Sequence, residues 1–358
     1  MKSPWLKTLI PAAALALPAG IVVPTPCAAQ DMGMSMPMAT PPPQPARVVI
    51  DSGAHRVIIT SGPWILPPVM MDERMMMSGA DEQGSGDEQL VVKFPWPLTG
   101  FVRGFRLTLT GPDGVVLPQH TMHHMEVVNV DRRQLLYPLA ERIVGIGGET
   151  DPITLPISVG MPLDPGQQIA LYVMWNNTTG RDMAGVNIRF ELLYSPANLT
   201  PQPLAVLPFR ADVNTKPGGG KAVYLAPPGR SEKSYEFMMP VSGHLLGVGG
   251  HMHDYGVELR LEDARTGKVL ARSRAITSAT GEVTGMGRQL LAVVGRGSYL
   301  KAGASYRVVS VYDNPTSDSV VAMGIMAGLF APTRMSEWPK LDRSDLQYRR
   351  DVGIPKRR

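Results

Sequence analysis

The sequence has 358 residues, of which 44% are hydrophobic, and it contains seven histidines, 22 methionines and a single cysteine. A chain of this length usually exceeds what one hydrophobic core can serve, so we expect two domains. The formal net charge of +4 at pH 7 falls to +2 without Lys2 and Lys7, and so weak a charge argues against a nucleic-acid partner. Cys27 lies in the N-terminal segment, so the rest of the chain has neither disulfides nor thiolate metal ligands.

The first 30 residues have the pattern of a secretory signal peptide. Two lysines precede an apolar run from Thr8 to Val23, and Cys27-Ala28-Ala29 offers the small residues that signal peptidases require. Prolines interrupt the apolar run, which argues against a retained membrane span. The sequence therefore predicts an exported protein, periplasmic or secreted.

Two methionine-rich segments lie near the beginning of the chain. Residues 31–46 alternate methionine with Gly, Ser and Pro before PPPQP, a composition typical of a disordered segment. Residues 70–88 are similarly polar and methionine-rich, and we expect a long loop there. Their thioethers are soft ligands, so the segments are either copper(I) donors for the rest of the chain or ordinary linkers.

The remaining sequence consists of short runs rich in β-branched and aromatic residues, such as HRVIIT, FRLTLT, IALYVMW and VELRLED, divided by Gly- and Pro-containing turns. Only residues 341–349, and less clearly 132–142, suggest a short helix. Many short strands with such turns predict an all-β chain with two jelly-roll-type antiparallel β-sandwich domains in tandem. We assign the domains to residues 47–198 and 206–335, followed by a polar tail over 336–358.

An internal echo supports two similar halves. The span from Leu163 to Asn177 has a Gly-containing turn followed by a strand, and the span from Leu300 to Asn314 has the same length and pattern. Each span lies downstream of a histidine pair. The echo indicates an internal duplication, although turns of this kind also recur by chance.

The second histidine pair has the spacing of a metal site. On a strand, residues i and i+2 share one face, so His251 and His253 can hold one ion together. Gly249 and Gly250 relieve crowding, and Asp254 is a candidate acceptor for a ligating imidazole. The alternative is a pair of histidines on a polar strand surface.

The first pair, His123 and His124, is adjacent in the sequence. Neighbours on a regular strand point to opposite faces, so a shared ion needs a bulge, a strand end or the use of different ring nitrogens. His120 is a possible third donor or simply a loop residue. Met323 and Met326, in AMGIMAGLF, either pack in a core or supply a thioether, and two imidazoles with one thioether would favour copper(I) over zinc.

The order and spacing of these motifs over residues 45–335 resemble the copper type II, ascorbate-dependent monooxygenases, the family of peptidylglycine α-hydroxylating monooxygenase and dopamine β-monooxygenase. The family has two jelly-roll domains, each with one copper. Its HHM motif is matched by His123-His124-Met125, and its H-x-H motif by His251-Met252-His253. Its ligand methionine is matched by Met323, in preference to Met326.

The chain also departs from the family pattern. Met174 stands where the family has the third histidine of the first site, so either Met174 or His120 completes that site, or the site is defective. Gly249 replaces the arginine that grips a peptide carboxylate, and Ala327 replaces a tyrosine. The resemblance therefore does not imply a glycine-extended peptide as substrate.

The resemblance implies a copper-dependent monooxygenase with two copper ions per chain. The implied metal ligands are His123, His124, Met174, His251, His253 and Met323. The last three would be catalytic, hydroxylating a C–H bond of a small molecule or peptide with O2, and the first three would pass on an electron from ascorbate or another small reductant. The alternatives are a non-catalytic periplasmic copper-binding or carrier protein, and a structural or adhesive β-sandwich module with incidental histidines.

Overall fold

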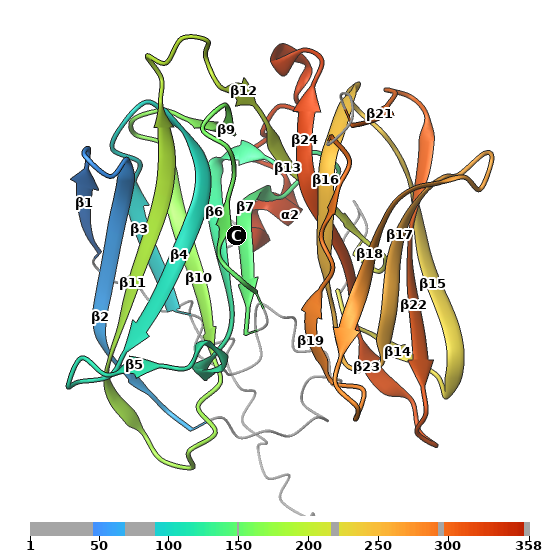
Figure 1. The fold of residues 1–358 in the computed structure, drawn as a ribbon, viewed down its shortest axis with the longest axis horizontal. Coiled ribbons are helices and arrows are strands. Elements are labelled where there is room, and N and C mark those ends of the chain that lie inside the picture. The colour runs from blue at the N-terminus through green and yellow to red at the C-terminus, as the bar shows by residue number, and fades with distance from the viewer. Residues whose placement is uncertain (1–45, 69–89, 149, 216–221, 293–296, 354–358) are drawn as a thin grey trace, which may run out of the picture. The chain divides into compact units, whose positions relative to one another are not determined.

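The computed structural model describes residues 46–68, 90–148, 150–215, 222–292 and 297–353, which all belong to one compact unit. The signal-peptide prediction, the methionine-rich segment up to residue 45 and the loop over 70–88 lie outside these residues. Nearly all of the regular structure is β (Figure 1). Among the described residues, no helix has the length and hydrophobicity needed to cross a membrane.

The first β-sandwich pairs a large sheet with a smaller one. The large sheet has the order β1 (Arg47–Asp51), β2 (Arg56–Leu66), β11 (Met183–Pro196), β4 (Gly100–Thr110), β9 (Val159–Leu163) and β12 (Leu204–Ala205), with β5 (Val116–Leu117) and β8 (Ile153–Thr154) beside β4. The smaller sheet has the order β3 (Leu90–Pro95), β10 (Gln168–Trp175), β6 (Met122–Arg133) and β7 (Ala140–Gly147). Their apolar faces enclose one core, because alternate residues such as Val57 and Ile59 of β2 point inward and are fully buried.

The second sandwich is built in the same way. One sheet has the order β13 (Leu207–Asp212), β24 (Gly324–Pro332), β16 (Gly243–Met252) and β20 (Gln289–Leu290), with β21 (Ser298–Leu300) also beside β16. The other has the order β15 (Gly229–Met238), β22 (Ser305–Asn314), β17 (Gly256–Asp263), β18 (Val269–Thr277) and β19 (Val283–Met286), and β14 (Tyr224–Ala226) pairs with β23 (Val320–Ala322). A second core fills this sandwich. The all-β prediction of two jelly-roll-type sandwiches in tandem is confirmed.

Helical structure is confined to short segments: η1 (Gln119–Thr121), η2 (Met335–Glu337) and α2 (Leu346–Asp351). The helix expected within residues 341–349 is present as α2, which begins after the capping carboxylate of Asp345. The helix suggested over residues 132–142 is wrong. That stretch is the end of β6, a connection and the start of β7, and its apolar residues 135–137 pack into the core of the second sandwich.

The internal echo appears as the same hydrogen-bonded anchor in both halves. Asn177 follows β10, its Nδ2 donates to the carbonyls of Leu66 and Arg181, and its Oδ1 accepts from the backbone N–H and hydroxyl of Thr179. The side chain is buried, so these bonds fix where the strand ends.

Asn314 makes the equivalent bonds after β22. Its Nδ2 donates to the carbonyls of Ala226 and Asp318, and its Oδ1 accepts from the backbone N–H and hydroxyl of Thr316. β10 lies between β3 and β6 as β22 lies between β15 and β17. The two halves therefore share an architecture as well as a sequence pattern.

Candidate functional site

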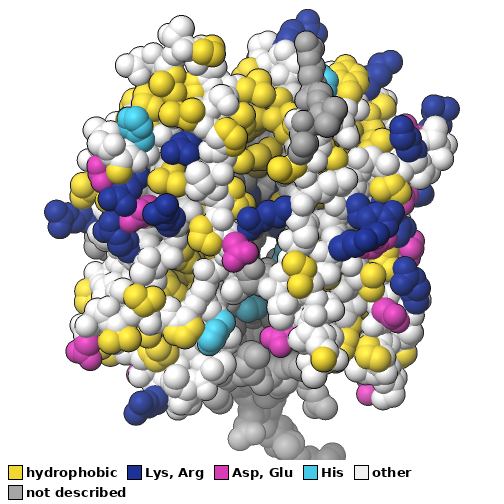
Figure 2. Space-filling model, in the orientation of Figure 1, with side chains coloured by type: hydrophobic (Ala, Val, Ile, Leu, Met, Phe, Trp, Pro, Cys, Tyr) yellow, Lys and Arg dark blue, Asp and Glu magenta, His cyan; other side chains and the backbone are white. Residues whose placement is uncertain are grey.

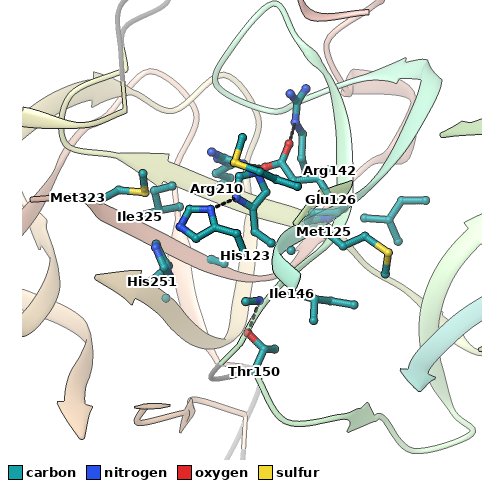
Figure 3. A pocket seen from close by; sticks show the side chains of 18 of the residues that line it. His123, Met125, Glu126, Arg142, Ile146, Thr150, Arg210, His251, Met323 and Ile325 are labelled. Carbon is teal, nitrogen blue, oxygen red and sulfur yellow. Dashed lines mark hydrogen bonds and ion pairs between the residues drawn. The ribbon is translucent and has the colours of Figure 1, made fainter. Parts of the chain in front are cut away.

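A cavity of about 260 Å³ lies between the two sandwiches. Its walls come from β6, β7 and β10 on one side and from β13, β16 and β24 on the other. Figure 3 shows His123 reaching toward His251 and Met323 across this space. The side chains expected as metal ligands that line the cavity are His123, His124, Met174, His251, His253 and Met323. Residues from the two halves, far apart in sequence, are thus brought to one site.

A β-bulge places the adjacent histidines together. β6 pairs with β10 so that His124 lies opposite Met174, but Trp175 lies opposite Met122, which leaves His123 as the additional residue. A bulge turns the extra residue out of the regular alternation. The Nδ1 atoms of His123 and His124 are consequently 3.2 Å apart. The bulge that a shared ion would require is present in the structure.

His124 and Met174 form the inner part of this wall. As directly opposite residues of an antiparallel pair, they project on the same side of the sheet and are close neighbours. Burial lowers the pKa of His124 to about 4, with smaller effects from nearby charges that include His251. The imidazole is therefore neutral at pH 7, which is the form that binds metals.

The opposite wall is organised by the buried hydroxyl of Tyr312. It accepts hydrogen bonds from the backbone N–H groups of His253 and Met323, each at 3.0 Å, and it donates to the carbonyl of Met323 at 2.5 Å. This uses the full hydrogen-bonding capacity of a phenol. It fixes the backbone of the two candidate ligands side by side, and the rings of His251 and His253 lie 5.4 Å apart at 82°.

Two further candidate donors do not line the cavity. Met326 is fully buried in the core of the second sandwich, because it alternates with Ile325, whose side chain faces the cavity. His120 is exposed in η1, where its carbonyl accepts from Nδ2 of Asn176. Of the two methionines, Met323, which the resemblance preferred, lines the cavity, and Met326 does not.

Charged residues that sequence reasoning missed form the end of the cavity. Glu126 of β6 accepts from Nε of Arg142 at 2.9 Å and from Nη1 of Arg210 at 2.6 Å. Arg142 also donates to Asp351 at the end of α2. Figure 3 shows Glu126 between the two arginines. Because Arg210 belongs to β13, this network joins the two sandwiches.

These groups are charged despite their burial. Burial alone would raise the pKa of Glu126, but Arg142 and Arg210 lower it by more, so the net shift is downward. The carboxylates of Asp351 and Glu126 raise the pKa of Arg142. The network is therefore ionised at neutral pH, and each charge has an opposite partner.

Direct hydrogen bonds also cross the boundary between the sandwiches. The Tyr137 hydroxyl accepts from the backbone N–H of Asp212 at 2.8 Å, and Trp338 Nε1 donates to the carbonyl of Arg133 at 2.8 Å. In the segment expected to be a polar tail, the buried Tyr348 donates to the carbonyl of Val130.

Figure 2 shows histidine side chains at the surface near the boundary between the two sandwiches, and His123 is exposed.

Comparisons with known proteins provide no assignment of function. No family model matches the chain, and no curated protein matches it. Similar solved structures include the STIV MCP, with 10% sequence identity and a TM-score of 0.36, covering 68% of this chain and 91% of that one. The major capsid protein P2 from bacteriophage PM2 has 10% identity and a TM-score of 0.36, covering 76% of this chain and 98% of that one. The mavirus major capsid protein has 9% identity and a TM-score of 0.26, covering 88% of this chain and 93% of that one. At such identities and TM-scores, these likenesses carry no argument about what this chain does.

The family assignment made from the sequence is corrected by these findings. No family model and no curated protein links the chain to the copper type II monooxygenases. Within the described ranges, no group of three or more His, Cys, Asp or Glu could hold a metal ion. The HHM and H-x-H motifs are only three residues long, so they can occur on strands of unrelated proteins. The monooxygenase activity, the enzyme class and the oxygen chemistry given to His251, His253 and Met323 are therefore withdrawn.

We predict that Glu126→Gln destabilises the protein by about 3 kcal/mol, because it leaves two half-buried guanidinium groups without their shared carboxylate. The free energy of unfolding from urea titration measures this. The matched control is Glu232→Gln, which removes an exposed partner of Arg260 and should change stability by about 0.5 kcal/mol or less. Equal effects of the two substitutions would contradict the assigned role of Glu126.

A second prediction concerns pH. The pKa of His124 in the folded protein, about 4, lies below the ordinary histidine value of about 6.5, so the unfolded chain binds a proton first as the pH falls. Its contribution to stability is complete above pH 6.5 and is lost as the pH falls toward 4. Between pH 7 and pH 4 the free energy of unfolding should fall in both proteins. We expect the fall to be smaller in His124→Gln than in the parent, by up to about 3 kcal/mol. Urea titrations at several pH values test this, with His120→Gln as the exposed control, and parallel curves for parent and His124→Gln would refute it.

Proposed function

We propose that this chain is a metal-binding protein whose cavity takes up copper in the monovalent state. The supporting observation is the convergence of four imidazoles and two thioethers on one cavity between the sandwiches. Methionine sulfur is a soft ligand that selects copper(I), and imidazole binds copper as well. The proposal assigns binding alone and no reaction.

The donors divide into two groups of the same composition. One group comes from the first sandwich, His123, His124 and Met174, and the other from the second sandwich, His251, His253 and Met323. Each combines two imidazoles with one thioether. We propose one copper ion at each group, two per chain, both within the same cavity.

The composition of each group favours copper(I) over zinc. Structural zinc sites are completed by nitrogen, thiolate or carboxylate ligands. Among the described side chains, no three His, Cys, Asp or Glu are arranged to hold an ion, so a third ligand from the protein must come from Met174 or Met323. A thioether in that position suits the softer ion.

Met323 and Met326 offer a matched pair of variants for testing this. Met323 lines the cavity, whereas Met326 is buried in the neighbouring core. We expect Met323→Leu to lower the affinity for copper(I) at least tenfold, because leucine has a similar volume but no donor atom. Met326→Leu should leave the affinity within a factor of two. Anaerobic competition titration with a chromophoric copper(I) chelator measures both.

Two outcomes would refute the proposal. One is a stoichiometry well below one copper per chain in the parent protein under these conditions. The other is an equal loss of affinity in both methionine variants, which would show that packing and not sulfur determines the effect. Under either result the chain would be better regarded as a β-sandwich with incidental histidines.

We also propose that the chain is exported. The support is the N-terminal pattern of lysines, an apolar run and small residues. We expect a mature form that lacks about the first 30 residues, which intact-mass measurement of the protein from a secretion-competent host can detect. Recovery of only the full-length mass from the soluble fraction would contradict export.

A further inference from the structure

One guanidinium group in the cavity has donors that the protein itself does not use. Arg210 lines the cavity and retains 22% side-chain exposure. Its Nη1 donates to Glu126, and within the described part of the chain neither Nε nor Nη2 has a hydrogen-bond partner. Those two nitrogens form one edge of the planar group and project parallel N–H bonds.

Arg142 differs from Arg210 although both bind Glu126. Arg142 donates through Nε to Glu126 and through Nη1 and Nη2 to Asp351, so its donors are satisfied by the protein. Asp351 is nearly fully buried behind it. The open edge of Arg210 is therefore the unsatisfied part of the network.

We propose that Arg210 binds the carboxylate of a small organic acid through Nε and Nη2. The paired N–H groups of a guanidinium edge match the two oxygens of a carboxylate, and this two-point hydrogen bonding is among the strongest in proteins. Glu126 occupies the third nitrogen and thereby holds the guanidinium plane in place.

The remainder of the cavity suits an apolar body on the same molecule. Ile143 and Ile146 of β7 line one side, and Ile325 of β24 lines the other. Its volume of about 260 Å³ lies near the lower end of the range of about 300–1,000 Å³ that is usual for small-molecule sites. The site therefore fits a monocarboxylic acid with a short aliphatic or single-ring body.

Binding of benzoate and hexanoate to the metal-free protein tests the proposal, with benzamide and hexanamide as neutral counterparts. We expect calorimetry and saturation-transfer NMR to detect the acids but not the amides. Arg210→Lys should weaken acid binding at least tenfold, because an ammonium group keeps the charge but lacks the planar edge. The matched control is Arg307→Lys, which alters an ion-paired arginine of the outer sheet and should leave binding within a factor of two.

Three results would overturn the proposal: no saturable binding of either acid at millimolar concentration, equal binding to the parent and to Arg210→Lys, or equal binding of acids and amides. Inorganic phosphate that competes as well as benzoate would overturn the carboxylate assignment in particular. Circular dichroism of each variant verifies folding. The copper proposal is tested separately, since Arg210→Lys should keep its copper(I) affinity and Met323→Leu should keep acid binding.

Discussion

The site depends on one carboxylate shared between two guanidinium groups. Glu126 projects from the first sandwich, Arg142 binds it from the same sheet, and Arg210 binds it from the second sandwich. Removing Glu126 takes from both guanidinium groups the carboxylate that they share, which is far more destabilising than losing an exposed ion pair. The network therefore holds the two sheets at a separation that leaves a cavity, and the histidine pairs face each other across it.

Much of the fold could be predicted because its signals are local. Short runs of β-branched and aromatic residues between Gly- and Pro-containing turns identified the strands. The turn-strand echo ending at Asn177 and Asn314 identified two similar halves, which the structure shows with equivalent hydrogen bonds. The helix suggested over residues 132–142 failed for a non-local reason. Its apolar residues 135–137 are buried by the other sandwich, and no helical face is involved. A pattern of apolar residues does not reveal which partner buries them.

The histidines and methionines of the site could be predicted from the sequence, but the charged residues around them could not. The spacing of His251 and His253 and the bulge required at His123 both follow from strand geometry. Glu126 and Arg210 are 84 positions apart in the chain, so their pairing exists only once the sandwiches have docked. Arg142 and Asp351 are 209 apart, and their pairing exists only once α2 has packed on the first sandwich. The family assignment failed because the motifs report where imidazoles lie on strands, and strand positions do not specify a reaction.

The geometry of Arg210 indicates that the network has a role besides docking. If its purpose were adhesion alone, we would expect Arg210 to have all its donors paired with carboxylates of the protein, as Arg142 has. Instead, Glu126 binds one nitrogen of Arg210, and Nε and Nη2 have no hydrogen-bond partner among the described residues, although Arg210 lines a cavity that isoleucines also line. The same carboxylate thus joins the two sandwiches and fixes the plane of an arginine that lines the cavity. If Arg210 binds a carboxylate as proposed, docking of the sandwiches and binding of the acid both depend on Glu126.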